Sequence, residues 1–293
     1  MQKEKQDEIY EISFSPRFTW ALTADPECRD WVDHFGSVMG LSKNRLSPSK
    51  PRIQVGPEST TLVHNQEGTR IRRIENYYAR YTYFPEELKV AVTLLEQSGD
   101  DPKSRTFSFK TLVITLTALM QQQGAIFLHA ATLVKNDDAV LIAASSGGGK
   151  STTASRVPPP WHAPGDECCI VLRDSDGYVV HVIPTWSAVA DDSHRSLRWD
   201  TKKPYRLRAF CVLMQDTKDE ICRIGPAQSI AAITSSARQA ASIQLDRSGK
   251  EMNQLYFSEC YRSAEAMSRT IPSYILRTTL TGQFWKILED ELW

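Results

Sequence analysis

The sequence predicts a mixed α/β fold in which the main sheet is largely antiparallel. Two pairs of apolar strands surround turn-forming segments at 136–138 and 174–177, and this spacing is typical of β-hairpins. Between the two pairs, a glycine-rich segment at 144–152 separates an apolar strand from a helix. The chain contains 41% apolar and 9% aromatic residues, which is sufficient for a globular core.

An N-terminal α+β region is predicted from two further patterns. Apolar side chains at helical spacing before Gly40 predict an amphipathic helix over 26–39. The segments 60–65 and 69–84 are expected to pair as a hairpin. The proline-rich segment 42–59 before them is expected to be a loop.

The polar segment 98–105 is the predicted boundary between domains at 1–100 and 101–293. After it, a helix over 108–123 is expected to close at Gly124. Further strands are predicted at 125–134, 139–144, 168–172, 178–183, 208–215, 220–225 and 273–280. Further helices are predicted at 226–241 and 282–292.

Charge and cysteine content indicate which partners and which cellular compartment to expect. The 35 basic and 35 acidic side chains cancel, so we expect neither nucleic acid nor membrane as a partner. Residues 1–10 carry charges of both signs and do not resemble a signal peptide. The six cysteines are interpreted as reduced thiols of a cytoplasmic protein, and the neighbouring Cys168 and Cys169 as packing in a buried strand.

Residues 144–151 match the P-loop pattern G-x-x-x-x-G-K-[ST] except at the first position, which is Ala144. The glycines allow backbone N–H groups to surround phosphate, Lys150 would reach the β- and γ-phosphates, and the Ser151 hydroxyl would bind Mg²⁺. The predicted nucleotide-binding residues are Ser145, Ser146, Gly147, Gly148, Gly149, Lys150, Ser151 and Thr152. A flexible glycine turn is the alternative, and Ala144 weakens the match if that position needs a positive φ.

Two carboxylates, Asp166 and Glu167, follow the loop closely. The prolines at 158–160 limit the intervening helix to about two turns. The chain must then turn back, and we expect both carboxylates to lie beside the loop. One would hold Mg²⁺ and the other would accept a hydroxyl proton.

Four segments, LHAA at 128–131, SSGGGKST at 145–152, GDE at 165–167 and VIPTW at 182–186, together resemble the HPr kinase family. The resemblance is greatest to the compact members that phosphorylate serine, and it covers about 108–292. It implies the fold of the HPr kinase C-terminal domain, which is similar to the nucleotide-binding part of phosphoenolpyruvate carboxykinase.

The same resemblance implies ATP and Mg²⁺ as cofactors and assigns roles to five residues. Lys150 would bind phosphate, while Ser151, Asp166 and Glu167 would serve the metal. We choose Asp166 as the base that orients the acceptor hydroxyl. His129 matches a histidine near the transferred phosphate, with a satisfied core histidine as the alternative.

The function implied is a kinase that transfers the γ-phosphate of ATP to a serine of a peptide or small protein. The segment 17–42 also resembles the ScmC proteins of SynChlorMet cassettes, which are associated with peptide-modifying radical enzymes, and this implies a ribosomal peptide modification pathway. The longer glutamate-arginine-glycine signature of bifunctional HPr kinases is absent, which argues against regulation of sugar transport. A peptide-binding accessory protein without phosphotransfer and a kinase for free serine remain alternatives, and assembly into a homo-oligomer is left open.

Two other features are candidates for binding the substrate. Edge strands at 68–84 are suited to accept a peptide by strand addition. Four arginines could instead hold phosphate or an acidic peptide, with ordinary solvated arginines as the alternative; they are Arg195, Arg198, Arg206 and Arg208.

Overall fold

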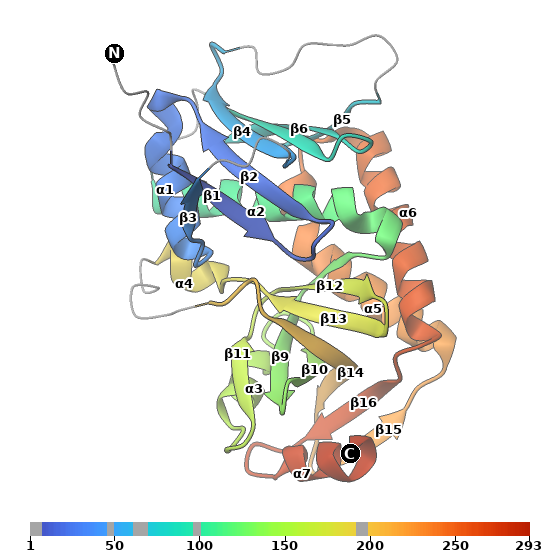
Figure 1. Cartoon of the computed structure of the whole chain (residues 1–293). Coiled ribbons are helices and arrows are strands. Elements are labelled where there is room, and N and C mark those ends of the chain that lie inside the picture. The colour runs from blue at the N-terminus through green and yellow to red at the C-terminus, as the bar shows by residue number, and fades with distance from the viewer. Residues whose placement is uncertain (1–7, 46–49, 61–69, 96–100, 192–198) are drawn as a thin grey trace. The chain divides into compact units, whose positions relative to one another are not determined.

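The computed structural model describes residues 8–45, 50–60, 70–95, 101–191 and 199–293. The chain divides into two compact units, and Figure 1 labels most of their helices and strands. The first unit contains Met1–Leu119, Trp186–Lys202 and Ile243–Gln254. The second contains Met120–Thr185, Lys203–Ser242 and Leu255–Trp293. The predicted domains at 1–100 and 101–293 stay a prediction, since part of their boundary, 96–100, lies outside the described residues.

The first unit is built on a mixed sheet. Its described strands are β1 (Glu8–Ser13), β2 (Thr19–Ala24), β3 (Lys43–Arg45), β4 (Arg52–Pro57), β5 (Arg72–Glu75), β6 (Ala79–Phe84) and β7 (Lys89–Leu94), in the spatial order β3-β1-β2-β4-β7-β6-β5. β4 runs parallel to both β2 and β7, and the other pairings are antiparallel. The helical elements are η1 (Pro26–Cys28), α1 (Arg29–Val38), α2 (Pro102–Met120), α4 (Trp186–Ala190) and η4 (Ile243–Leu245).

The prediction of a loop over 42–59 was wrong, because β4 lies in the middle of this sheet. Ile53 and Val55 are fully buried, while Arg52 and Gln54 are exposed, which is the pattern of a half-buried strand. The prolines misled the prediction, yet Pro51 precedes β4 and Pro57 ends it, where neither interrupts the ladder.

The predicted strand over 69–84 is two strands, β5 and β6, which form their own hairpin. Its turn is held by the buried Asn76, whose Oδ1 accepts hydrogen bonds from the N–H groups of Tyr78 and Ala79. Asn76 Nδ2 also donates to Thr111 Oγ1 at 2.8 Å. The proposed partner strand at 60–65 lies almost wholly outside the described residues.

The helix predicted over 26–39 is confirmed as η1 followed by α1. The helix predicted over 108–123 begins earlier, at Pro102, because Asp101 accepts hydrogen bonds from the first-turn N–H groups of Lys103 and Ser104. Gly124 follows the closing 3₁₀ turn η2 (Gln121–Gln123) with φ +76°, as predicted.

The second unit contains a nine-stranded mixed sheet in the described residues. Its strands are β8 (Ile126–Leu128), β9 (Ala130–Lys135), β10 (Asp138–Ala143), β11 (His162–Gly165), β12 (Cys169–Asp174), β13 (Gly177–Val182), β14 (Pro204–Gln215), β15 (Glu220–Arg223) and β16 (Ser273–Thr278). Both predicted hairpins, β9–β10 and β12–β13, are confirmed as antiparallel pairs. β14 is parallel to β10 and to β16.

One predicted strand, 125–134, is divided at His129. β8 before it pairs with β12, whereas β9 after it pairs with β10. A periodicity pattern cannot show such a change of partner, since both halves are buried and apolar.

The helices of the second unit are α3 (Lys150–Ser155), α5 (Pro226–Ala241), most of α6 (Gly249–Ser268) and α7 (Phe284–Leu292). α3, α5 and α7 were predicted, and α6 was not. Its buried residues Tyr256, Cys260, Ala264 and Met267 recur at helical spacing and could have revealed it. No helix in the described part of the chain is long and apolar enough to cross a membrane.

Candidate functional site

The sheet of the second unit brings three chain segments to one edge. β10 ends at Ala143, which pairs with Ala130, the first residue of β9. β11 ends at Gly165, which pairs with Thr132 near the same end of β9. The loop after β10, the residue before β9 and the turn after β11 therefore lie at one edge of the sheet.

The glycine loop connects β10 directly to α3. Gly147 and Gly149 have φ angles of +72° and +96°, a region that side-chain-bearing residues rarely adopt. Ser145, Ser146 and Gly147 are exposed. The sequence thus uses glycine where the backbone must reverse between a buried strand and a helix.

Ala144 fits this loop without strain. The residues other than glycine with positive φ in the described chain are Leu88, Asn136 and Asp137, so Ala144 does not need the conformational freedom of glycine. Its methyl group belongs to the core cluster that contains Trp161. Alanine in place of the first glycine of the P-loop pattern therefore causes no backbone strain in the folded loop.

Lys150 is the buried charged residue of this segment. It is 8% exposed, and its Nζ donates to the carbonyl oxygen of Ala144 at 3.4 Å. Burial lowers the pKa of Lys150, while Cys168, Asp166 and Glu167 are close enough to oppose that shift electrostatically. The neighbouring Ser151 and Thr152 are exposed on α3.

Asp166 and Glu167 occupy the turn between β11 and β12, and both are partly buried. The expected return of the chain is confirmed, because α3 ends at Ser155 and β11 then pairs with β9, next to β10. The hydroxyl of Thr185 donates to Asp166 Oδ1 at 2.9 Å. Both predicted carboxylates therefore lie near Lys150.

His129 lies between β8 and β9 and is partly exposed. Its backbone N–H donates to the carbonyl of Ser236, and its carbonyl accepts from the Ser236 hydroxyl at 3.1 Å. Its ring Nδ1 is 3.3 Å from Gln239 Oε1. The backbone of His129 therefore lies at the same edge of the sheet as the glycine loop, while its ring contacts α5.

The structure also brings residues to this edge that the sequence analysis missed. β14 ends at Gln215, whose Nε2 lies 3.4 Å from the position a Cβ on Gly149 would take. The next residue, Asp216, accepts a hydrogen bond from Arg277 Nη1 at 2.6 Å, and this bond lowers the pKa of Asp216. An apolar run that ends in Gln215 and Asp216 was the available signal, but only the pairing shows that β14 lies beside β10.

Arg206 and Arg208, two of the candidates for holding phosphate or an acidic peptide, do not lie at this edge, so the structure gives no support to a role at the glycine loop. Both donate to Asp138, at 2.6 and 2.9 Å. Asp138 begins β10, whereas the glycine loop follows its last residue, Ala143. The other two arginines, at 195 and 198, lie outside the described residues.

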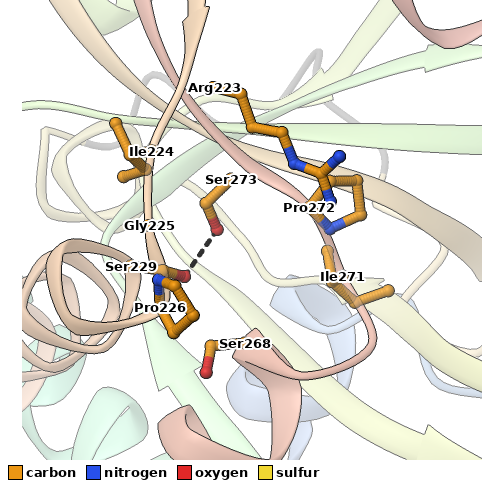
Figure 2. A pocket seen from close by; sticks show the side chains of 9 residues that line it. All are labelled: Arg223, Ile224, Gly225, Pro226, Ser229, Ser268, Ile271, Pro272 and Ser273. Carbon is orange, nitrogen blue, oxygen red and sulfur yellow. Dashed lines mark hydrogen bonds between the residues drawn. The ribbon is translucent and has the colours of Figure 1, made fainter.

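A separate pocket of about 390 Å³ lies at the other end of β16. Figure 2 shows the hydrogen bond between Ser229 and Ser273 on its wall. It opens near Ser273, the first residue of β16, whereas Gln215 at the glycine loop pairs with Thr278, the last. None of the predicted site residues line this pocket.

A family model described as SynChlorMet cassette protein ScmC matches residues 93–292. No curated protein matches the chain. The matched region does not include 17–42, the segment whose resemblance suggested this family, and the wider resemblance to HPr kinases stays a prediction. Because the match covers more than half of the sequence, the chain belongs to the ScmC family of SynChlorMet cassette proteins.

Proposed function

We propose that this chain is an ATP- and Mg²⁺-dependent kinase that phosphorylates a serine of a peptide or small protein in a ribosomal peptide modification pathway. The observation that carries the proposal is the buried Lys150 behind a glycine loop, with Asp166 and Glu167 within electrostatic reach. A buried ammonium is costly without a strong partner. A triphosphate on the loop would supply that partner.

In this proposal the loop residues 145–152 surround the β- and γ-phosphates through their backbone N–H groups, and Lys150 adds a positive charge. No cluster of three His, Cys, Asp or Glu side chains in the described residues could hold a metal by itself. Ser151, Asp166 and Glu167 nevertheless offer the oxygen ligands that Mg²⁺ prefers, and phosphate and water oxygens commonly complete its shell. When bound, Mg²⁺ neutralises charge on the phosphates.

The transfer itself needs orientation more than covalent chemistry from the protein. The acceptor serine oxygen forms a bond to the γ-phosphorus while the bond to the bridging oxygen breaks and ADP leaves. The hydroxyl proton passes to the carboxylate of Asp166. In this proposal His129, on the same edge of the sheet, would contact the transferred phosphate once its ring turns from Gln239 on α5.

The test is incubation of the full chain with γ-labelled ATP, Mg²⁺ and peptides encoded beside its gene. Label should appear on serine in the peptide and should disappear with Lys150→Ala. Lys250→Ala changes an exposed lysine on α6 and serves as the matched control. Transfer should continue in this control, since Lys250 lies on no part of the proposed site.

Three outcomes would contradict the proposed peptide kinase. ATP binding without transfer to any peptide or to free serine would favour a nucleotide-dependent accessory protein that binds the peptide. Transfer to free serine but to no peptide would identify a metabolite kinase instead. Failure to bind ATP at all would refute all three nucleotide-dependent functions.

A further inference from the structure

Thr185 is held opposite Asp166 by the hairpin that precedes it. Cys169 pairs with Val182 at the end of β12–β13. The ladder continues beyond the strands, because the N–H of residue 183 donates to the carbonyl of Cys168 at 3.4 Å. Counting outward from this antiparallel register places Thr185 across from Asp166.

The contact made at that position is directional. Thr185 Oγ1 donates to Asp166 Oδ1 at 2.9 Å, and both side chains are partly buried. A carboxylate can otherwise rotate about its terminal bond, which has a broad torsional preference. A donor on Oδ1 limits that rotation and determines where Oδ2 points.

We propose that Thr185 is a positioning residue, whose hydroxyl fixes one carboxylate oxygen of Asp166 so that the other meets the metal or the acceptor hydroxyl. This inference rests on the proposed kinase function. Branching at Cβ makes threonine stiff about χ1, which suits a residue that must hold its hydroxyl in one place. Hydrogen-bond partners of this kind commonly affect metal affinity or activity by about 10- to 100-fold.

The test compares Thr185→Val, which keeps the shape and removes the donor, with Thr185→Ser, which keeps the donor. We expect Thr185→Val to lower kcat about 10- to 100-fold and to weaken Mn²⁺ binding in the presence of ADP. Electron paramagnetic resonance measures the Mn²⁺ binding. ATP affinity without metal should stay within about twofold, because the phosphate loop itself is unchanged. Thr185→Ser should restore both metal-dependent values to within about threefold of the original protein.

Thr270→Val, at an exposed threonine, controls for the general effect of the substitution, and circular dichroism checks the folding of each variant. Equal impairment in the valine and serine variants would refute the positioning role, since the hydroxyl would not be the feature that matters. Unchanged Mn²⁺ binding and kcat in Thr185→Val would also refute it. If the unsubstituted protein binds Mn²⁺ with ADP but transfers no phosphate, the kinase fails while the Mn²⁺ comparison still decides the role of Thr185. If it binds no nucleotide, both proposals fail.

Discussion

Replacing Lys150 by methionine should weaken nucleotide binding strongly while leaving the stability of the free protein almost unchanged. Its Nζ makes a hydrogen bond of 3.4 Å to Ala144, a distance at the long end of the range, so its loss should cost less than about 1 kcal/mol. The substitution also removes a buried charge, which offsets that cost. We therefore expect the free energy of unfolding without ligand to change by no more than about 1 kcal/mol.

In the presence of ATP, the stability of the original protein and that of Lys150→Met should differ strongly. Charge-assisted hydrogen bonds contribute about 1.5–3 kcal/mol, so losing such a contact from Lys150 should weaken ATP binding about 10- to 150-fold. With ATP at about 100 times its dissociation constant, the original protein gains about 2.7 kcal/mol, whereas a variant that binds 100-fold more weakly gains about 0.4 kcal/mol. Thermal unfolding should then rise by about 5–10 °C in the original protein and by about 1–2 °C in the variant.

The assay is thermal unfolding with and without ATP and Mg²⁺, together with the pH dependence of stability without ligand. Burial lowers the pKa of Lys150 in the folded protein below the ordinary value of 10.5. At pH values between the folded-state pKa and 10.5, the unfolded chain therefore binds more protons than the folded protein. Stability should therefore rise with pH in that window, and Lys150→Met should lose this contribution. A marked loss of stability without ligand, with equal thermal shifts in ATP, would refute the reasoning and identify Lys150 as a structural residue.

Three further substitutions test the site and its scaffold. Asp166→Asn should lower phosphotransfer at least about 100-fold in the labelled-ATP assay. Asp174→Asn, at the far end of the β12–β13 hairpin, is the control. If Asp166→Asn lowers transfer less than this control does, Asp166 is not the base. Gly165→Ala should destabilise the protein by about 1–3 kcal/mol in urea unfolding, because the new Cβ would lie 2.5 Å from Val182 Cγ1; no loss would show that the turn relaxes freely. Asp138→Asn should cost about 1–3 kcal/mol at pH 7. Burial raises the pKa of Asp138, but hydrogen bonds from two arginines outweigh it and lower the pKa below 3.8, so this difference should shrink as the pH falls below 3.8, and a constant difference would contradict the ion pair.

Several elements around the candidate site were predictable from local sequence. The turns between β9 and β10 and between β12 and β13 carry residues that favour reversal, and Asn136 and Asp137 adopt positive φ as such a turn requires. The prolines at 158–160 stop α3 after six residues, which returns Asp166 to the sheet. These features depend on neighbouring residues and leave a mark in the sequence.

Other features were hidden because they depend on distant partners. Two prolines beside β4 made a central strand look like a loop, although the parallel neighbours of β4 are what stabilise it. Arg206 and Arg208 looked available for phosphate until the fold placed Asp138 between them. An ion pair across adjacent strands has no local signature in either strand.

For this protein, the sequence by itself determined the glycine loop, the buried strand before it, the short helix after it and the two carboxylates that follow. Only the tertiary structure decided that β9 lies between β10 and β11 and so brings Lys150 and Asp166 to one edge. It also decided that Thr185 holds Asp166 and that Gln215 and Asp216 lie near the loop. The physical reason is that turns and helix ends are specified by adjacent residues, whereas the order of strands in a sheet depends on burial and hydrogen bonding summed over the whole unit.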